Sequence, residues 1–600
     1  MHKIAVLDFG GQYSHLIANR IRRIGVYTEI LDPETSIDDL REYKGFVLSG
    51  GPASVNAQDS LTCDPQLFEL GVPVLAICYG HQLMAKTLGG EVENGKVSEY
   101  GSADINFSKK LGIFERMGSV ESAWMSHFDQ VVAAPEGFEI VASTEDCPIA
   151  ATVNLEKKLY SVQFHPEVTH TENGMKILED FVDETTAKKE WSIETYIEDI
   201  TKEIQDKVGD KKVFLMISGG VDSTVAYLLL EKALDPDRVY GLFVDTGFMR
   251  KDERQEVEAA LAKAGISNLH VYDASNEYFD ALDGVYEPEE KRIIIGDLFL
   301  DIQAKVSEKL NLNPEEWFLA QGTIYPDTIE TGGSKHAHKI KTHHNQVERI
   351  LKLKEEGKVI EPLDQLYKDE VRLVGKSLGL NDEIVSRHPF PGPGLAVRIL
   401  CAQKEDSFEG MKKIEVEINE LVKNDGLEAK VLPIKSVGVQ GDERTYRHPV
   451  LLCGKGVYWD RLNSLSTQLT NRFAEINRVL YLVSPQEVAD LSVVPNHMTR
   501  QRTLLIQNAD KAVMDYIKEA SMHTEIWQFP TVLLPIAVNS EEGESIVLRP
   551  VCSTEAMTAN FYRMDFDKLG ELKSRLDAID GVTAVFYDIT NKPPGTIEWE

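Results

Sequence analysis

Cysteine is scarce in this sequence. Only six cysteines occur among 600 residues, and no two of them form a CxxC pair. Such wide spacing indicates neither a disulfide framework nor a zinc site built on paired cysteines. A cysteine can therefore be singled out as a nucleophile only by the residues around it.

Long hydrophobic runs are also missing. No stretch approaches the roughly 20 apolar residues that are needed to cross a bilayer. The apolar segment Ile4–Leu7, which follows Met1-His2-Lys3, is too short for the hydrophobic region of a secretory signal. We therefore expect a cytosolic protein without membrane contact.

Basic charge is outweighed by acidic charge. The 64 lysines and arginines face 97 aspartates and glutamates, which gives a formal net charge of −33. This excess repels a nucleic-acid backbone and favours solubility, so we expect no nucleic-acid partner. Any phosphate must be held by a local group of donors.

The length predicts three or four domains, because one hydrophobic core does not extend over 600 residues. Short apolar runs alternate with helical patterns throughout, which is typical of α/β architecture. A polar stretch before Trp191 and the proline-rich segment His388–Gly394 mark boundaries. The predicted domains are 1–187, 191–394 and 395–600. In the last of these, Leu432-Pro433-Ile434 recurs as Leu534-Pro535-Ile536, which indicates a duplicated α+β subdomain or a chance match.

The first candidate site centres on a cysteine at a strand-to-helix turn. The apolar run Val72–Ile77 leads directly into Cys78-Tyr79-Gly80 and a helical pattern. A sharp turn of this kind raises the side chain above the sheet, and the helix N-terminus favours a thiolate. A buried structural cysteine is the commoner reading of such a residue taken alone.

A second strand supplies the partners of that thiol. It ends in His165, and Glu167 follows two residues later, so the histidine could exchange a proton with Cys78 while the carboxylate orients the ring. The backbone N–H groups of Gly51 and Tyr79 are candidates for an oxyanion hole. Together these residues closely resemble the class I glutamine amidotransferases over about residues 1–185, although Ala76 stands where that family usually has glycine.

The second candidate site is a glycine-rich loop between the strand Val213–Ile217 and a helix. Glycines at a helix N-terminus are typical of phosphate binding, and a Walker A lysine is missing. The loop resembles that of the N-type ATP pyrophosphatases, an adenine-nucleotide α-hydrolase-like fold. The resemblance implies ATP binding, with Mg²⁺ near Asp222. The predicted ATP-binding residues are Ser218, Gly219, Gly220, Val221, Asp222, Ser223, Thr224 and Asp245. The histidine pairs His336/His338 and His343/His344 are interpreted as part of a phosphate-covering lid.

The chain as a whole resembles the GMP synthetase family, chiefly in Arg387–Gly394 and the terminal Lys592–Glu600. That resemblance implies an α/β multidomain enzyme with an α+β C-terminal domain. It also implies that xanthosine monophosphate (XMP), ATP and glutamine are the small-molecule substrates, and that glutamine-derived ammonia aminates the adenylated nucleotide. The residues expected to bind XMP are Gly392, Pro393, Asp442, Arg444, Arg549, Lys592 and Glu598.

An insertion at about 453–531 resembles the longer form of that family. Because the C-terminal domain of shorter members dimerises, the extra subdomain could replace that contact within one chain. Monomer and homodimer both stay open.

Two alternatives remain. The first is a related adenylating amidotransferase such as NAD synthetase, or an argininosuccinate- or asparagine-forming relative, none of which fits the ending KPPGTIEWE. The second is an inactive copy that senses nucleotides or binds protein, which the intact Cys78, His165 and glycine-rich loop disfavour.

Overall fold

The computed structural model divides into two compact units. One unit holds Met1–Glu203 with Thr323–Thr342 and Leu363–Ser377, and the other holds Ile204–Gly322, His343–Pro362 and Leu378–Glu600. The structure describes the chain except residues 1, 12, 59, 169, 264–268, 310–315, 326–352, 355, 386–389, 441–442, 541 and 554–558. Within the described part, no helix has the length and apolar character to cross a membrane.

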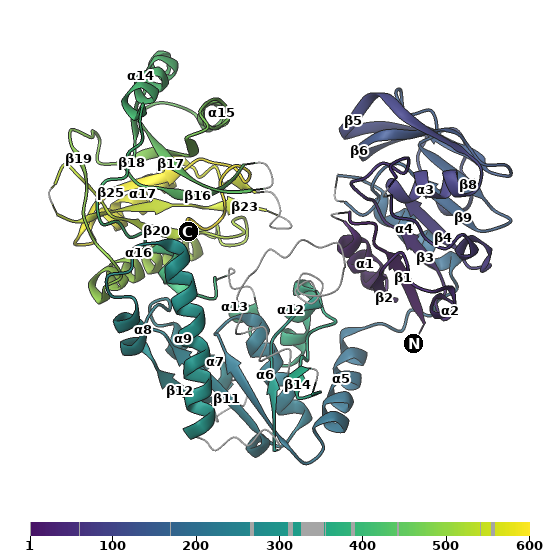
Figure 1. Ribbon diagram of the computed structural model, residues 1–600, viewed down its shortest axis with the longest axis horizontal. Helices are drawn as coiled ribbons and strands as arrows, with labels where there is room; N and C mark the ends of the chain where they lie inside the picture. The colour runs from purple at the N-terminus through teal and green to yellow at the C-terminus, as the bar shows by residue number, and fades with distance from the viewer. Residues whose placement is uncertain are drawn as a thin grey trace. The chain divides into compact units, whose positions relative to one another are not determined.

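The first unit is built on a nine-stranded sheet in the order β2-β1-β3-β4-β9-β8-β7-β5-β6. Pairing is parallel from β2 to β9 and antiparallel from β9 to β6. The strands are β1 (Lys3–Leu7), β2 (Tyr27–Leu31), β3 (Phe46–Leu48), β4 (Val74–Ile77), β5 (Glu91–Phe107), β6 (Val120–Ala133), β7 (Glu139–Ser143), β8 (Ala151–Asn154) and β9 (Leu159–Val162). Figure 1 shows the long β5–β6 hairpin at one side of this sheet.

Helices cover both faces of the parallel part of the sheet. Alternate residues of each strand point to opposite faces, so both faces carry apolar side chains that need to be buried. On β1, Ile4 and Val6 pack with Ile17 and Phe181, whereas Ala5 and Leu7 pack in a second cluster with Leu83. The helices of this unit are α1 (Ser14–Arg23), α2 (Ile37–Leu40), α3 (Tyr79–Thr87), α4 (Gly174–Glu184) and α12 (Lys368–Ser377), and α5 (Ile193–Val208) begins in it.

The helix α12 is joined to α1 by a buried arginine. The side chain of Arg22 donates to the carbonyl of Thr28 and lies 3.4 Å from Glu370 Oε2. Its guanidinium also faces the rings of Tyr27 and Trp191. Trp191, which the sequence placed at a domain boundary, donates to the other oxygen of Glu370.

The second unit begins with a parallel sheet of order β12-β11-β10-β13-β14. Its strands are β10 (Lys212–Ile217), β11 (Val239–Asp245), β12 (Leu269–Asp273), β13 (Trp317–Ala320) and β14 (Val359–Ile360). Its helices are α6 (Val221–Ala233), α7 (Glu253–Lys263), α8 (Ser275–Ala281), α9 (Pro288–Lys309) and α13 (Asp382–Val385).

The C-terminal part of this unit repeats one element order, α-β-β-β-α-β. The first copy is α14 (Met411–Val422), β15 (Glu428–Val431), β16 (Ser436–Gln440), β17 (Glu443–Cys453), α15 (Trp459–Arg472) and β18 (Ile476–Ser484). The second is α16 (Arg500–Glu519), β20 (Thr531–Leu534), β21 (Ile536–Val538), β22 (Glu544–Leu548), α17 (Phe566–Asp577) and β25 (Val582–Asp588). Three short strands complete this part: β19 (Leu491–Val493), β23 (Val551–Cys552) and β24 (Asn560–Phe561).

The two copies share a sheet whose order is symmetric, β15-β17-β18-β25-β22-β20. The last strands of the copies, β18 and β25, pair antiparallel at its centre. The repeated Leu-Pro-Ile string therefore marks a repeated structure, since each string falls at the junction before the second strand of its copy.

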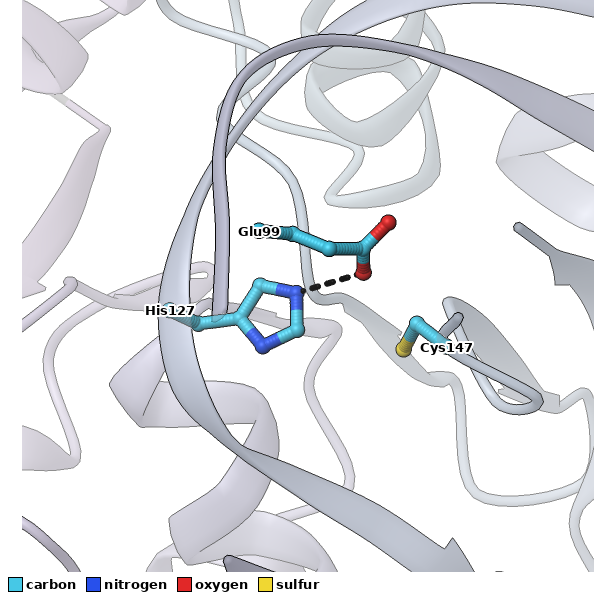
Figure 2. A group of neighbouring side chains, drawn as sticks. All are labelled: Glu99, His127 and Cys147. Carbon is cyan, nitrogen blue, oxygen red and sulfur yellow. Dashed lines mark hydrogen bonds and ion pairs between the residues drawn. The ribbon is translucent and has the colours of Figure 1, made fainter. Parts of the chain in front are cut away.

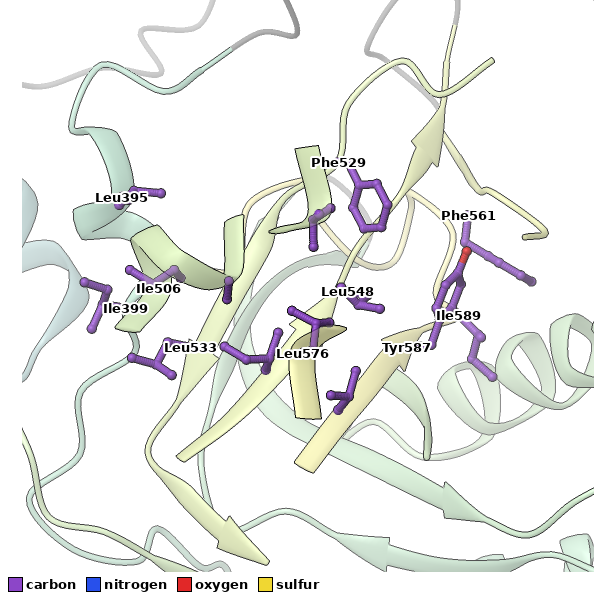
Figure 3. Close-up of a cluster of buried hydrophobic side chains, with 14 of the residues drawn as sticks. Leu395, Ile399, Ile506, Phe529, Leu533, Leu548, Phe561, Leu576, Tyr587 and Ile589 are labelled. Carbon is purple, nitrogen blue, oxygen red and sulfur yellow. The ribbon is translucent and has the colours of Figure 1, made fainter. Parts of the chain in front are cut away.

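One hydrophobic core connects this sheet with the segment that leads into it. Leu395 and Ile399 lie beside Ile506 of α16, and Leu533, Leu548 and Tyr587 extend the cluster along the sheet (Figure 3). All six side chains have at most 5% exposure. The core thus spans both copies and the end of the pyrophosphatase-like region.

A buried ionic cluster lies in the same sheet. Asp588 accepts from Arg478 at 2.9 Å, and Arg549 lies 3.1 Å from its other oxygen. Trp599 also donates to this carboxylate, at 3.1 Å. Burial lowers the pKa of Arg478 to about 10, although the charge of Asp588 opposes that shift.

We expect Asp588→Asn to destabilise the C-terminal sheet by about 3–5 kcal/mol, because it leaves two buried guanidinium groups without their counter-charge. Urea unfolding followed by tryptophan fluorescence measures the loss. The matched control is Asp460→Asn, which removes a largely exposed partner of Arg563 and should have little effect. Equal unfolding midpoints for the two variants would contradict the assignment.

Candidate functional site

The thiol of Cys78 lies on a strained turn between β4 and α3. Cys78 has φ +54° and ψ −104°, a conformation that side chains other than glycine rarely adopt. The preceding strand is entirely buried, and the helix begins at the next residue. The turn places the sulfur at the N-terminus of α3, where helical N–H groups favour negative charge.

Close packing behind the turn explains the glycine two residues later. A Cβ on Gly80 would lie 2.5 Å from the carbonyl oxygen of Leu48 in β3. Only a residue without a side chain lets α3 approach the sheet this closely. Ala76, where the related family usually has glycine, is fully buried in β4.

His165 and Glu167 come from the loop after β9, the strand that pairs with β4. Nδ1 of His165 lies 2.7 Å from Oε1 of Glu167, and both residues are buried. Burial would lower the pKa of His165, but the carboxylate of Glu167 and the nearby Cys78 outweigh it and raise that pKa to about 10. Glu167 therefore favours the protonated form of the ring, which can receive the proton of the Cys78 thiol. The structure thus brings the three predicted residues together.

Two glycines that follow β3, Gly50 and Gly51, pack close to the residues of this site. A Cβ on Gly50 would lie 3.2 Å from Cε1 of His165 and 3.7 Å from Cβ of Cys78. A Cβ on Gly51 would meet the Phe9 carbonyl oxygen at 2.8 Å and the Tyr79 ring at 3.1 Å. The predicted oxyanion residues Gly51 and Tyr79 are therefore neighbours of each other, and each is next in sequence to a residue of this group, Gly50 and Cys78 respectively.

The β5–β6 hairpin contributes a wall of this site that the sequence did not reveal. The carbonyl of Ser126 accepts from the Cys78 thiol at 3.5 Å. The side chain of Gln82 donates to the carbonyl of Asp129 on the same strand at 2.7 Å. No local pattern signals these contacts, because they depend on the curvature of a long hairpin.

The glycine-rich loop joins β10 to α6. Gly219 has φ +80°, and Gly220 caps the helix. The Ser218 N–H donates to Ser223 Oγ, and the Thr224 hydroxyl donates to the Gly220 carbonyl at 2.9 Å. The Thr224 N–H donates to the Gly220 carbonyl at 3.2 Å, so α6 begins directly after the glycines and its N-terminus faces the loop, an arrangement that favours a phosphate.

This loop opens into a pocket of about 270 Å³. Its far wall comes from Phe299, Leu300 and Gln303 of α9, which sequence reasoning missed. Its side is formed by Gly322 after β13, where an added Cβ would lie 3.1 Å from the Ser223 backbone. The pocket thus offers an aromatic side chain, amide donors and the Asp222 carboxylate around one helix N-terminus.

Asp245 lies in a different pocket from the loop. It ends β11, where its Oδ1 accepts from the Gly247 N–H. The pocket that it lines measures about 400 Å³ and is shared with Asp273 and Arg500 but with no residue of the loop. The structure therefore does not place Asp245 among the loop's pocket residues.

The predicted XMP residues near the end of the sequence are distributed between surface and interior. Glu598 is held by Arg398 through a two-point contact at 2.8 and 3.0 Å, and Gln528 donates to it at 3.2 Å. Neither Arg398 nor Gln528 was identified from the sequence, because nothing local links them to the tail. Lys592 is half-buried, and that burial lowers its pKa.

The remaining predicted XMP residues behave differently from one another. Arg549 is completely buried, and it donates to the Thr596 carbonyl while pairing with Asp588, so its guanidinium faces no solvent. This placement argues against a direct phosphate contact. Arg444 is exposed and lies 3.6 Å from Glu289. Gly392 and Pro393 form a turn, whereas Asp442 and the predicted lid histidines lie outside the described residues.

Three family models match successive parts of the chain. The model of class-I glutamine amidotransferases matches residues 5–185, that of NAD synthase matches 193–302, and that of the GMP synthase C-terminal domain matches 515–599. The first two matches contain the thiol site and the glycine-rich loop respectively.

Curated relatives match at greater length. A protein of Leptospira interrogans named as a probable glutamine-hydrolysing GMP synthase is 48% identical over 604 residues, with 100% of this chain and 99% of the relative covered. The GMP synthase of Clostridium novyi is 37% identical over 610 residues, at the same coverage. That of Caldanaerobacter subterraneus is 43% identical over 511 residues, which cover 98% of the relative but 81% of this chain.

Proposed function

This chain belongs to the family of glutamine-hydrolysing GMP synthases, and we propose that Cys78 releases ammonia from glutamine while the glycine-rich loop binds the ATP that activates XMP. The chain is a ligase that forms a C–N bond in glutamine-dependent GMP synthesis. The observation that carries the residue assignments is the convergence of Cys78, His165 and Glu167 within a chain whose full length matches these enzymes.

In the glutaminase half, Cys78 attacks the side-chain amide of glutamine. His165 takes the proton of the Cys78 thiol as the sulfur attacks, and Glu167 stabilises the charge on the ring until that proton passes to the departing ammonia. A water then hydrolyses the thioester to glutamate. The N–H groups of Gly51 and Tyr79 would stabilise the oxyanion, since the two residues contact each other and directly follow Gly50 and Cys78.

In the synthetase half, the oxygen on C2 of XMP attacks the α-phosphorus of ATP, and pyrophosphate leaves. Ammonia then attacks C2, and AMP leaves with the former C2 oxygen. The N-terminus of α6, where Gly220, Asp222 and Ser223 line the pocket, would hold the pyrophosphate portion, and Phe299 of the same pocket would pack against adenine.

Mg²⁺ fits the same pocket, which combines the Asp222 carboxylate with the hydroxyls of Ser218 and Ser223. Ser218, Asp222 and Ser223 would hold the ion, which when bound would supply positive charge against the leaving pyrophosphate. We retain the sequence prediction of Asp222 as a ligand, because these oxygen donors suit the ion.

For XMP, Lys592 and Glu598 are the residues we retain as direct contacts. Glu598 has 21% side-chain exposure and is oriented by Arg398 and Gln528, so it can accept from a sugar or base while holding one conformation. Arg549 supports the tail through Asp588 and the Thr596 carbonyl. Arg444, Gly392, Pro393 and Asp442 stay predictions.

The acidic composition supports a protein of the cytosol that does not bind nucleic acid.

NAD synthesis is a weaker alternative: the NAD synthase model matches only residues 193–302, whereas the full-length relatives are GMP synthases.

Replacing the thiol should separate the two half-reactions. In Cys78→Ala we expect glutamine-driven GMP formation to fall by more than about 10³-fold while synthesis from ammonium chloride persists, because only the first site needs a nucleophile. GMP is measured by chromatography with ATP and XMP present. Cys63→Ala, which removes another buried thiol of the same unit, is the control and should keep both activities. Loss of the ammonia-driven reaction in Cys78→Ala would contradict the division of labour.

The pH dependence of glutamine hydrolysis should report the charge on His165. The protonated ring is present below its pKa and is lost as pH rises through about 10, so kcat/KM for glutamine should decline only near that pH. In Glu167→Gln the ring loses its stabilising charge, and the decline should move to lower pH. Glu172→Gln changes an exposed carboxylate nearby and should leave the profile unchanged. Identical alkaline limbs in the wild type and Glu167→Gln would refute the role of Glu167.

The symmetric C-terminal sheet supports a monomeric enzyme. In a twofold dimer of a single-copy domain, identical strands from two chains would meet antiparallel at the axis. Here β18 and β25 of one chain form that central pair. We therefore expect sedimentation to give the mass of one chain, 67.3 kDa, at micromolar concentration. A stable dimer under these conditions would show that the duplication does not replace the contact.

A further inference from the structure

Three potential metal ligands converge beside the thiol site although they are distant in the sequence. They are Glu99 of β5, His127 of β6 and Cys147 of the loop between β7 and β8. One donor atom from each lies within 4.8 Å of the other two. Figure 2 shows the Glu99 carboxylate and the Cys147 sulfur on the same side of the His127 ring, with the carboxylate next to the ring nitrogen.

The hydrogen bonds of His127 place one ring nitrogen opposite an atom that cannot donate a hydrogen to it. Its Nδ1 lies 3.0 Å from the carbonyl oxygen of Asp129, which can only accept, so Nδ1 carries the hydrogen. In a neutral ring, Nε2 then presents a lone pair. That lone pair faces Oε2 of Glu99 at 3.0 Å, and a carboxylate oxygen also only accepts.

Either a second proton or a metal cation resolves this contact. A second hydrogen would satisfy only the contact between His127 and Glu99, whereas a cation would also engage the sulfur of Cys147, which is fully buried and belongs to the same group of donor atoms. A histidine whose Nδ1 donates to a backbone carbonyl is also the usual arrangement of a metal-ligating imidazole.

We propose that Glu99, His127 and Cys147 bind one zinc ion through a carboxylate oxygen, Nε2 and Sγ, with solvent as the fourth ligand. Zinc accepts oxygen, nitrogen and sulfur donors in tetrahedral geometry, whereas Mg²⁺ prefers oxygen alone. Bonds of about 2.0–2.3 Å separate tetrahedral ligand atoms by roughly 3.3–3.8 Å, so the His127–Glu99 contact opens by only a few tenths of an ångström.

Charge balance also favours a divalent ion. Binding releases the thiol proton to solvent, and the two negative charges of the carboxylate and the thiolate then neutralise Zn²⁺. Cys147 is fully buried, and Glu99 has 11% side-chain exposure, so solvent can reach the fourth position from the Glu99 side.

The ion would act as a structural clamp. It would tie the β5–β6 hairpin to the loop before β8, where the Thr144 hydroxyl already donates to Oε1 of Glu99 at 2.8 Å. The adjacent residue Ser126 contacts Cys78, so the clamp would hold the wall of the thiol site without entering its chemistry. The proposal does not depend on the reaction assigned above.

Zinc binding is tested on the full chain in a Cys78→Ser background, because Cys78 and His165 could otherwise bind the ion themselves. Chelator-treated protein is titrated with zinc, bound metal is counted by mass spectrometry, and cobalt is used in parallel to detect a thiolate-to-metal charge-transfer band. We expect one equivalent and a clear band. Adding Cys147→Ser should abolish both, and Glu99→Gln, which keeps the thiol, should weaken zinc binding at least tenfold.

The control is Cys63→Ser in the same background. Cys63 is another buried thiol of the unit, and burial raises its pKa to about 12. Its removal should leave the zinc equivalent and the cobalt band intact. Zinc should also raise the Tm of the parent but not of the Cys147→Ser protein, since only the former binds it. The proposal fails if the folded parent binds no zinc, or if Cys147→Ser and Glu99→Gln both bind it as tightly as the parent does.

Discussion

The strained turn at Cys78 is the constraint on which the first site depends. A positive φ at a residue with a side chain costs free energy, and the surrounding structure must hold it. The buried strand β4 fixes one side, and the contact of Gly80 with the Leu48 carbonyl fixes the other. Because β3, β4 and β9 are parallel neighbours, their carboxyl ends bring Gly50, Cys78 and His165 to one edge of the sheet. The glutaminase geometry is therefore a property of the sheet as much as of three residues.

The second site has the same strand-turn-helix arrangement, but a different charged group faces the helix N-terminus. In each unit a buried parallel strand ends, the chain turns, and a helix points its N-terminus at the reacting group. At Cys78 the positive end of the helix favours a sulfur anion that belongs to the protein. At Ser218–Ser223 it would favour a phosphate of the ATP that we propose binds there. The two turns differ in composition: the first holds the side chain of Cys78, and the second consists of glycine backbone.

Local signals in the sequence were sufficient for both turns and for most strands around them. The strands β4 and β10 follow from short-range pattern and burial. The grouping of Cys78, His165 and Glu167, and the helix N-terminus at the loop, followed from the same local reasoning. The repeated Leu-Pro-Ile string was a weaker signal, yet it marked a real repetition of topology.

Long-range contacts were beyond such reasoning. Nothing near Phe299 indicates that α9 faces the loop, and nothing near Gln528 indicates that it contacts Glu598. Arg549 has the chemistry of a phosphate ligand, but its strand carries it into the interior, where Asp588 takes its charge. Likewise, Cys147 meets His127 only through the curvature of the hairpin, so counting cysteine spacings could not find that cluster.

The doubled sheet has a consequence for how many nucleotides one chain can process. The tail after β25 crosses to the first copy, where Gly595 bridges Gly438 of β16. The equivalent tail after β18 crosses to the second copy, where β19 pairs with β21. The first of these exchanged tails carries Lys592 and Glu598, but the second presents Leu491 and Val493 at its pairing strand. The two tails thus differ in composition, and only the one after β25 carries residues that we propose to contact XMP, so we expect one nucleotide site in each chain.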